Sequence, residues 1–204
     1  SMHSFYANKA QSYHYADYSI FLAEIASITS ELLLHEHLIK TSKDKNFRAV
    51  LINHLLDEFR ATVVRQTMFA EFELIIHKHR EEDETLTADF LKEKYYSLVC
   101  EYFGEKVFCD KLIEYEWARI PHFHYGFYVY KYATGFAASA KFAKRLVDGD
   151  RGALDGYVKF LECGSSRDVL DILKTCGIEH ESNEFINDAF LLFEKKMEEL
   201  LLLP

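Results

Sequence analysis

The scarcity of helix-breaking residues is the feature that most constrains the fold of this chain. Its 204 residues include only two prolines, Pro121 and Pro204, and eight glycines. Proline and glycine are the residues least compatible with a helix interior, so long stretches can stay helical without interruption. Apolar residues recur at helical spacing along most of these stretches. We therefore expect an all-α protein of about seven helices with no sheet, organised as a single domain over residues 1–204.

The expected helices are separated by turn and capping residues. They cover residues 15–40, 45–81, 87–104, 121–147, 152–162, 168–176 and 183–202, with a short helical piece at 111–115. Side chains that can accept hydrogen bonds from first-turn N–H groups precede three of them, namely Thr85 or Thr87, Ser165 or Ser166, and Ser182 or Asn183. Pro121 suits the first turn of the helix expected over 121–147.

Charge and cysteine content exclude several classes of protein. The chain has 24 basic and 33 acidic residues, which argues against nucleic acid as its main partner. No apolar run approaches the roughly 20 residues needed to cross a bilayer, so we expect no membrane association. The four cysteines form no C-x-x-C pair and are expected to be reduced thiols, which favours a cytoplasmic location.

One carboxylate lies inside the most apolar part of the first expected helix. Glu24 is surrounded by seven apolar residues, which are Ile20, Phe21, Leu22, Ala23, Ile25, Ala26 and Ile28, so the helix is predicted to be buried on nearly every side. A buried carboxylate must be neutral, paired with a cation or bound to a metal ion. Glu31 follows seven positions later and is expected on the same face. The pattern alone leaves a salt bridge and a metal site both open.

Polar rings are concentrated between residues 116 and 135. This stretch contains His122, His124, Tyr125, Tyr128, Tyr130 and Tyr132. The rings could form an aromatic core segment, in which each buried phenol needs a hydrogen-bond partner. They could instead line a cleft and donate hydrogen bonds to a substrate oxygen that gains negative charge. On a continuous helix Tyr125, Tyr128 and Tyr132 would share a face, and His122 would lie nearer Tyr130.

The remaining histidines carry weaker signals. His35 and His37, like His77 and His79, are two residues apart and would point to different sides of a helix. We expect both pairs to be solvated surface residues. The chain contains no H-E-x-x-H motif, no glycine-rich phosphate loop and no G-x-S-x-G elbow.

Three stretches together resemble the C-terminal part of the oligoendopeptidase F family, zinc peptidases related to thimet oligopeptidase. They are Ser1-Met2-His3-Ser4 with residues 18–31, then residues 65–73, then residues 116–135. The stretches occur in the family's order, and the resemblance extends over essentially the whole chain. In that family an H-E-x-x-H motif comes directly before the Ser-Met-His-Ser stretch, and a glutamate about 25 residues beyond its second histidine completes the zinc site.

The resemblance implies roles for particular residues. Glu24 would be the third zinc ligand, and Glu31 would orient a ligand imidazole. His122, Tyr125 and Tyr130 would bind the peptide and stabilise the tetrahedral intermediate. The family more often has tyrosine where this chain has His124. The intact protein would then be a zinc metalloendopeptidase that hydrolyses oligopeptides.

The chain begins where the metal-binding motif would have ended. Two zinc ligands and the general-base glutamate are therefore missing, and we expect a fragment that packs against the absent N-terminal part of a larger peptidase and is inactive by itself. Two other interpretations stay open. The chain could be a non-catalytic helical module that binds peptides or a partner protein. Alternatively, Glu24 and the tyrosines could be structural groups of the core.

Overall fold

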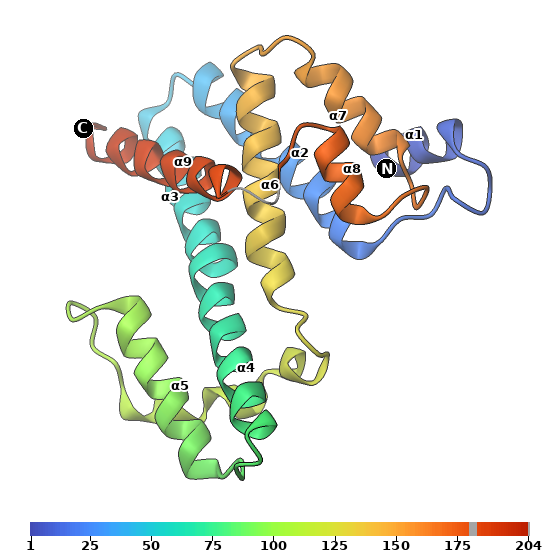
Figure 1. The fold of residues 1–204 in the computed structure, drawn as a ribbon. Helices are drawn as coiled ribbons and strands as arrows, with labels where there is room; N and C mark the ends of the chain where they lie inside the picture. The colour runs from blue at the N-terminus through green and yellow to red at the C-terminus, as the bar shows by residue number, and fades with distance from the viewer. Residues whose placement is uncertain (180–182, 204) are drawn as a thin grey trace. The chain divides into compact units, whose positions relative to one another are not determined.

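The computed structural model describes residues 1–179 and 183–203 (Figure 1). Over these residues the chain forms nine α-helices, two 3-10 helices and one π-helical segment, and no strand occurs among them. The prediction of an all-α protein is confirmed, with two more α-helices than the seven expected. No helix in this part of the chain is both long enough and apolar enough to cross a membrane.

The chain divides into two compact units. The first unit comprises Ser1–Phe59 and Thr134–Pro204, and the second comprises Arg60–Ala133. The single domain expected from the sequence over residues 1–204 stays a prediction.

The first unit is a cluster of helices that come from two distant parts of the sequence. It contains α1 (Met2–Ala10), α2 (Ile20–Thr41), α3 (Lys45–Phe59), α7 (Ala153–Glu162), α8 (Val169–Thr175), α9 (Glu184–Leu201) and most of α6 (Tyr130–Val147). α1 packs on α7, and α3 packs on both α2 and α9 (Figure 1). The Ser139 hydroxyl of α6 donates a hydrogen bond to the carbonyl oxygen of Ile25 at 3.1 Å, which joins α6 to α2.

The second unit is built on two α-helices. It contains the π-helical segment η1 (Arg60–Val64), α4 (Arg65–Glu81), α5 (Ala88–Phe103), and the 3-10 helices η2 (Lys111–Arg119) and η3 (Pro121–His124). α5 packs on α4 and on η2 (Figure 1). The buried core of this unit consists of Met68, Phe69, Phe72, Tyr95, Leu98, Val99, Ile120 and Val129.

Most expected helix ends agree with the structure. The Thr87 hydroxyl accepts a hydrogen bond from the Phe90 N–H at 3.2 Å, and Gly104 ends α5 with φ +71°. Asn183 is the residue before α9, and Ser182 lies outside the described residues. The cap of α8 was predicted wrongly as Ser165 or Ser166. It is Asp168, whose carboxylate accepts from the Leu170 N–H at 3.0 Å.

The helix predicted over residues 121–147 is wrong in its first third. Pro121 does start a helical turn, but this is the four-residue η3, and α6 begins only at Tyr130. Between them Gly126 and Phe127 have φ values of +56° and +51°. This left-handed backbone cannot continue a right-handed helix. Tyr125 and Tyr130 therefore belong to different elements.

The prediction that α2 is buried on nearly every side is also wrong. Its buried residues are Leu22, Ile25, Ala26, Thr29, Leu32 and Ile39, which form one face. Ile20 and Leu34 are 55% and 54% exposed. Residues 15–19 were also predicted helical but are not. The helix begins at Ile20, and the Ser19 side chain caps it by accepting a hydrogen bond from the Leu22 N–H at 3.4 Å.

Candidate functional site

Glu24 is a half-buried carboxylate on α2. It forms no hydrogen bond and no ion pair with any residue that the structure describes. The salt bridge to Glu24 that the sequence pattern allowed is therefore absent among the described residues. α2 is a regular helix over both glutamates, and seven residues are about 20° short of two full turns. Glu24 and Glu31 consequently lie on the same side of α2, as expected.

Glu31 lines a cavity of the first unit between α1, α2 and α7. The cavity has a volume of about 560 Å³, and its lining includes His3, Tyr18, Ser27, Ser30, Glu31 and Tyr157. Glu31 itself is exposed. Glu24 is next to this lining on the helix surface, because Ser27 and Glu31 follow it at helical spacing. The cavity brings the Ser-Met-His-Ser stretch and residues 18–31 together.

His3 is a buried histidine with unsatisfied ring nitrogens. Only 6% of the residue is exposed, and neither Nδ1 nor Nε2 has a hydrogen-bond partner in the described part of the chain. Its ring stacks on Tyr18 with a centroid separation of 3.6 Å, and the Tyr18 hydroxyl is 2.7 Å from the Ser4 hydroxyl. Burial lowers the pKa of His3 to about 4. The imidazole is therefore neutral at pH 7.

His122 lies in a cluster of tyrosine rings in the second unit. Its ring is parallel to that of Tyr128 at 5.8 Å, and the rings of Tyr125 and Tyr132 lie at 5.9 and 6.2 Å. The expectation that His122 would lie nearer Tyr130 than these three tyrosines was based on an unbroken helix, which the structure does not have. The bend at Gly126 and Phe127 brings His122 and Tyr125 to the tyrosines at the start of α6.

The other predicted residues of this region are more exposed. Tyr125 is 62% exposed and Tyr130 is 48% exposed, whereas His122 is half-buried. His124 is exposed as well. The phenol groups of Tyr125 and Tyr130 can therefore reach a ligand from solvent, while the stacked His122 has a more fixed orientation. Glu24 and Glu31 belong to the first unit, and His122, Tyr125 and Tyr130 belong to the second.

A buried glutamate holds the bend in place. Glu73 of α4 is completely buried, and its Oε1 atom accepts a hydrogen bond from the Phe127 N–H at 2.6 Å. Its Oε2 atom has no partner among the described residues. The backbone of the bend is therefore fixed by a side chain from another helix, next to the ring of His77, which contacts Phe127 at 4.4 Å.

A second polar network lies under the start of this region. Oε1 of Glu116 accepts a hydrogen bond from Arg65 at 2.8 Å and another from Arg119, and Oε2 accepts one from the Tyr95 hydroxyl at 2.7 Å. Burial acts to raise the pKa of Glu116, but the hydrogen bonds from Tyr95 and the two arginines outweigh it and the pKa is lowered. Burial and the hydrogen bond to Glu116 raise the pKa of Tyr95. Arg65 and Glu116 thus connect the second and third stretches of the resemblance.

Sequence reasoning missed the anchoring roles of Glu73 and Glu116, although a carboxylate between apolar core residues was visible at position 73, as it was at position 24. The expectation of solvated histidines is right for His37, which is exposed. It is wrong for His77 and His79. His77 Nδ1 donates to the Glu73 carbonyl oxygen at 2.7 Å, and the ring of His79 stacks on Phe90 at 3.9 Å.

Known proteins resemble this sequence over nearly its whole length. The sequence profile of peptidase family M3 matches residues 1–192. The oligopeptidase PepF of Bacillus subtilis is 46% identical over 200 residues, which are 98% of this chain and 30% of that protein. A chromosomal oligoendopeptidase F of Lactococcus lactis is also 46% identical over 200 residues, covering 98% of this chain and 33% of its own length.

A solved structure is also similar to this chain over nearly its whole length. The crystal structure of oligoendopeptidase F from Enterococcus faecium superimposes with a TM-score of 0.90 at 40% identity, covering 99% of this chain and 36% of that one. The chain thus spans about a third of the length of the relatives that it matches. The match, which extends over nearly all of the sequence and includes the helices that hold the candidate residues, shows that this chain belongs to peptidase family M3.

Proposed function

We propose that this chain is the C-terminal part of the catalytic region of a zinc metalloendopeptidase that hydrolyses oligopeptides. Membership of peptidase family M3 supports a peptidase activity for the whole protein. The observation that carries the proposal to a particular residue is the half-buried carboxylate of Glu24, which has no hydrogen-bond or ion-pair partner among the described residues. Partial removal of a carboxylate from water without a cation is unfavourable unless a ligand compensates it.

The donor set of this chain fits a share of such a zinc site. Glu24 would supply one carboxylate oxygen, and Glu31, two turns further on, would accept a hydrogen bond from an imidazole that also binds the ion. Bound zinc would polarise the peptide carbonyl and lower the pKa of water to about 7. Catalytic zinc commonly has three protein ligands, so the other two and the general base would come from the part of the protein that packs against this chain and precedes it.

The tyrosine cluster of the second unit would bind the substrate. The exposed hydroxyls of Tyr125 and Tyr130 would donate hydrogen bonds to the peptide and to the oxygen that becomes negatively charged. His122, held parallel to Tyr128, would donate from a fixed orientation. His124 is exposed and belongs to the same 3-10 helix as His122, and we assign it no part in the reaction.

The test is Glu24→Gln in the full-length protein. This change keeps the size of the side chain but removes its charge, so we expect zinc content to fall and oligopeptide hydrolysis to be lost. Glu82→Gln, at the exposed C-cap of α4, is the matched control and should change neither property. Unchanged zinc content and activity in Glu24→Gln would contradict the proposal and leave a structural role for this residue. A full-length protein that binds oligopeptides without hydrolysing them would favour the non-catalytic binding module.

A further inference from the structure

Three metal-binding side chains meet on the first unit away from Glu24. They are His35 of α2 and His54 and Glu58 of α3, and one ligand atom from each lies within 4.8 Å of the others. Among the described residues, no other three His, Cys, Asp or Glu side chains bring their ligand atoms this close together. His35 was expected to be a solvated surface residue, but it is half-buried and its ring contacts that of His54 at 5.5 Å.

The helices place these groups in a favourable arrangement. His54 and Glu58 are four residues apart, which puts both side chains on the same face of α3, and His54 Nε2 is 3.7 Å from Glu58 Oε1. α2 packs on α3 and supplies His35 from the other side. Ligands of a tetrahedral zinc ion are about 3.3 Å apart, given bonds of about 2.0 Å. The three atoms therefore need to approach one another by about 1.5 Å or less. The His54 side chain is 60% exposed and so is free to make part of this adjustment.

His35 supplies a second, independent observation. Its Nδ1 atom is buried, and it has no hydrogen-bond partner within the described residues. A buried polar nitrogen without a partner is unfavourable. A metal ion that binds this nitrogen directly would satisfy it.

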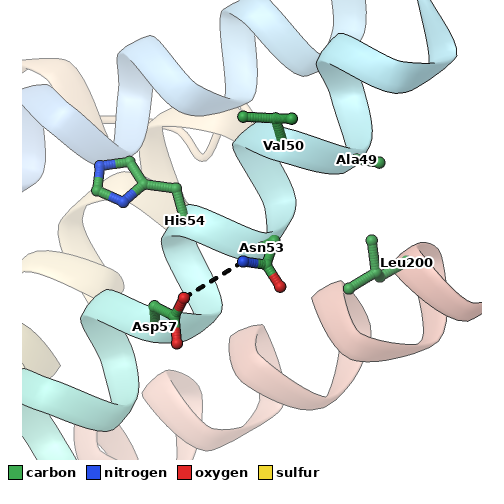
Figure 2. A pocket seen from close by; sticks show the side chains of 6 residues that line it. All are labelled: Ala49, Val50, Asn53, His54, Asp57 and Leu200. Atoms are coloured by element: carbon green, nitrogen blue, oxygen red, sulfur yellow. Dashed lines mark hydrogen bonds between the residues drawn. The ribbon is translucent and has the colours of Figure 1, made fainter.

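The site is accessible through His54. A neighbouring pocket of about 490 Å³ is lined by Ala49, Val50, Asn53, His54, Asp57 and Leu200 (Figure 2). The Asn53 side chain donates to the Asp57 carboxylate at 3.2 Å, and the His54 ring is turned away from this pair (Figure 2). The side chain of His54 is 60% exposed, so an ion can reach it from solvent without any movement of the helices.

We propose that His35, His54 and Glu58 form a divalent metal site that is separate from the one assigned to Glu24. Two imidazoles and one carboxylate suit zinc better than magnesium or calcium, which prefer sites made of oxygen ligands alone. Three protein ligands leave a fourth position for water. His35 follows Glu24 by eleven residues, which is about 16 Å along the axis of α2. One ion therefore cannot be bound by both.

The experiment measures the zinc bound per full-length protein after equilibration with zinc alone and removal of weakly bound ions. We expect the unaltered protein to retain one zinc equivalent more than His54→Ala. Glu58→Gln should lower the affinity for this zinc ion by at least about 10-fold. Even changes to residues that only support the ligands typically cause a loss of this size. His37→Ala, an exposed histidine on the same helix as His35, is the matched control and should retain the full amount.

Repeating the comparison in a Glu24→Gln background separates this inference from the proposed function. The difference of one equivalent should persist there, whether or not the first site binds zinc. Equal zinc content in the unaltered protein and His54→Ala would overturn the proposal, and so would a difference that disappears in the Glu24→Gln background. Because His54 is largely exposed, its replacement should leave the helical circular dichroism unchanged, which confirms that any loss of zinc is a loss of ligands.

Discussion

Two regions of this protein carry the candidate residues, and they are held in place by different forces. α2 is one regular helix, which apolar residues such as Leu22, Ile25 and Leu32 fix against its neighbours. The segment from 121 to 129 is irregular, and the polar contact between Glu73 and the Phe127 N–H fixes its bend. Helical periodicity therefore predicts neighbours correctly on α2 and incorrectly around His122. The lesson is that a periodicity argument holds only as far as the helix does.

The largest effect is expected for Ile25→Ala, which tests whether apolar burial fixes α2 in place. Ile25 is fully buried, and truncation of a buried isoleucine typically costs about 2 to 5 kcal/mol of unfolding free energy. Amide hydrogen exchange in α2 should accelerate accordingly. Ile20→Ala, on the same helix but 55% exposed, is the control and should have little effect. Equal effects of the two changes would mean that apolar burial does not fix α2.

On the polar side, Glu116→Ala should cost about 3 kcal/mol, near the low end for a buried ion pair that loses one partner, because Arg65 keeps part of its hydration. The pKa of Glu116 is lowered in the folded protein. Its stabilisation is thus complete above the unfolded pKa of about 4.3 and is lost as pH falls through the folded value. Urea unfolding at pH 7 and pH 3 should show the cost of the change shrinking in acid, whereas Glu93→Ala, at an exposed position, should show no cost at either pH.

The proposed role of Tyr125 in the irregular region can be tested by steady-state kinetics. If Tyr125 donates to the developing oxyanion, Tyr125→Phe should lower kcat of the full-length protein by about 100-fold, which is typical of removing one such donor. KM should change much less, because the hydrogen bond would be strongest in the transition state. Tyr13→Phe, on a residue 92% exposed in the first unit, should leave both constants unchanged. A rise in KM alone would instead make Tyr125 a binding residue.

The smallest expected effect concerns the bend itself. An alanine at position 126 would meet no atom within 4 Å, so its only cost is the left-handed backbone at φ +56°, which is about 1 kcal/mol. Faster hydrogen exchange should be confined to the residues near the bend. Gly126→Asn should cost less, because asparagine tolerates this backbone conformation better. If both variants exchange at the same rate as the unaltered protein, the bend does not depend on this glycine.

The helical fold could be predicted from the sequence because it follows from local patterns. The absence of breakers, the cap at Thr87 and the glycine at position 104 each act within a few residues of the helix that they shape. The break before Tyr130 could not be predicted, because it depends partly on Glu73, which is 54 residues away from Phe127 in the chain. Pro121 and Gly126 marked the region, but both are compatible with a helix start.

The candidate site shows the same limit. The side of α2 that carries Glu24 and Glu31 follows from their spacing, whereas the half-buried state of Glu24 depends on helices that pack against only one face. His35 illustrates the point most directly, since spacing within α2 gave it no partner. Its neighbours His54 and Glu58 come from α3, and their separation of four residues was the one signal in the sequence that could have suggested a pair of ligands.

The contact from Glu73 to the backbone of the bend has a consequence for protein engineering. Glu73 is fully buried, yet it binds the backbone at Phe127, between the Tyr125 and Tyr130 positions on which the proposed peptide recognition depends. Libraries intended to change cleavage preference would normally vary only exposed tyrosines such as Tyr125. Including position 73, with shorter or uncharged replacements, would change the support of the bend while every ring is retained.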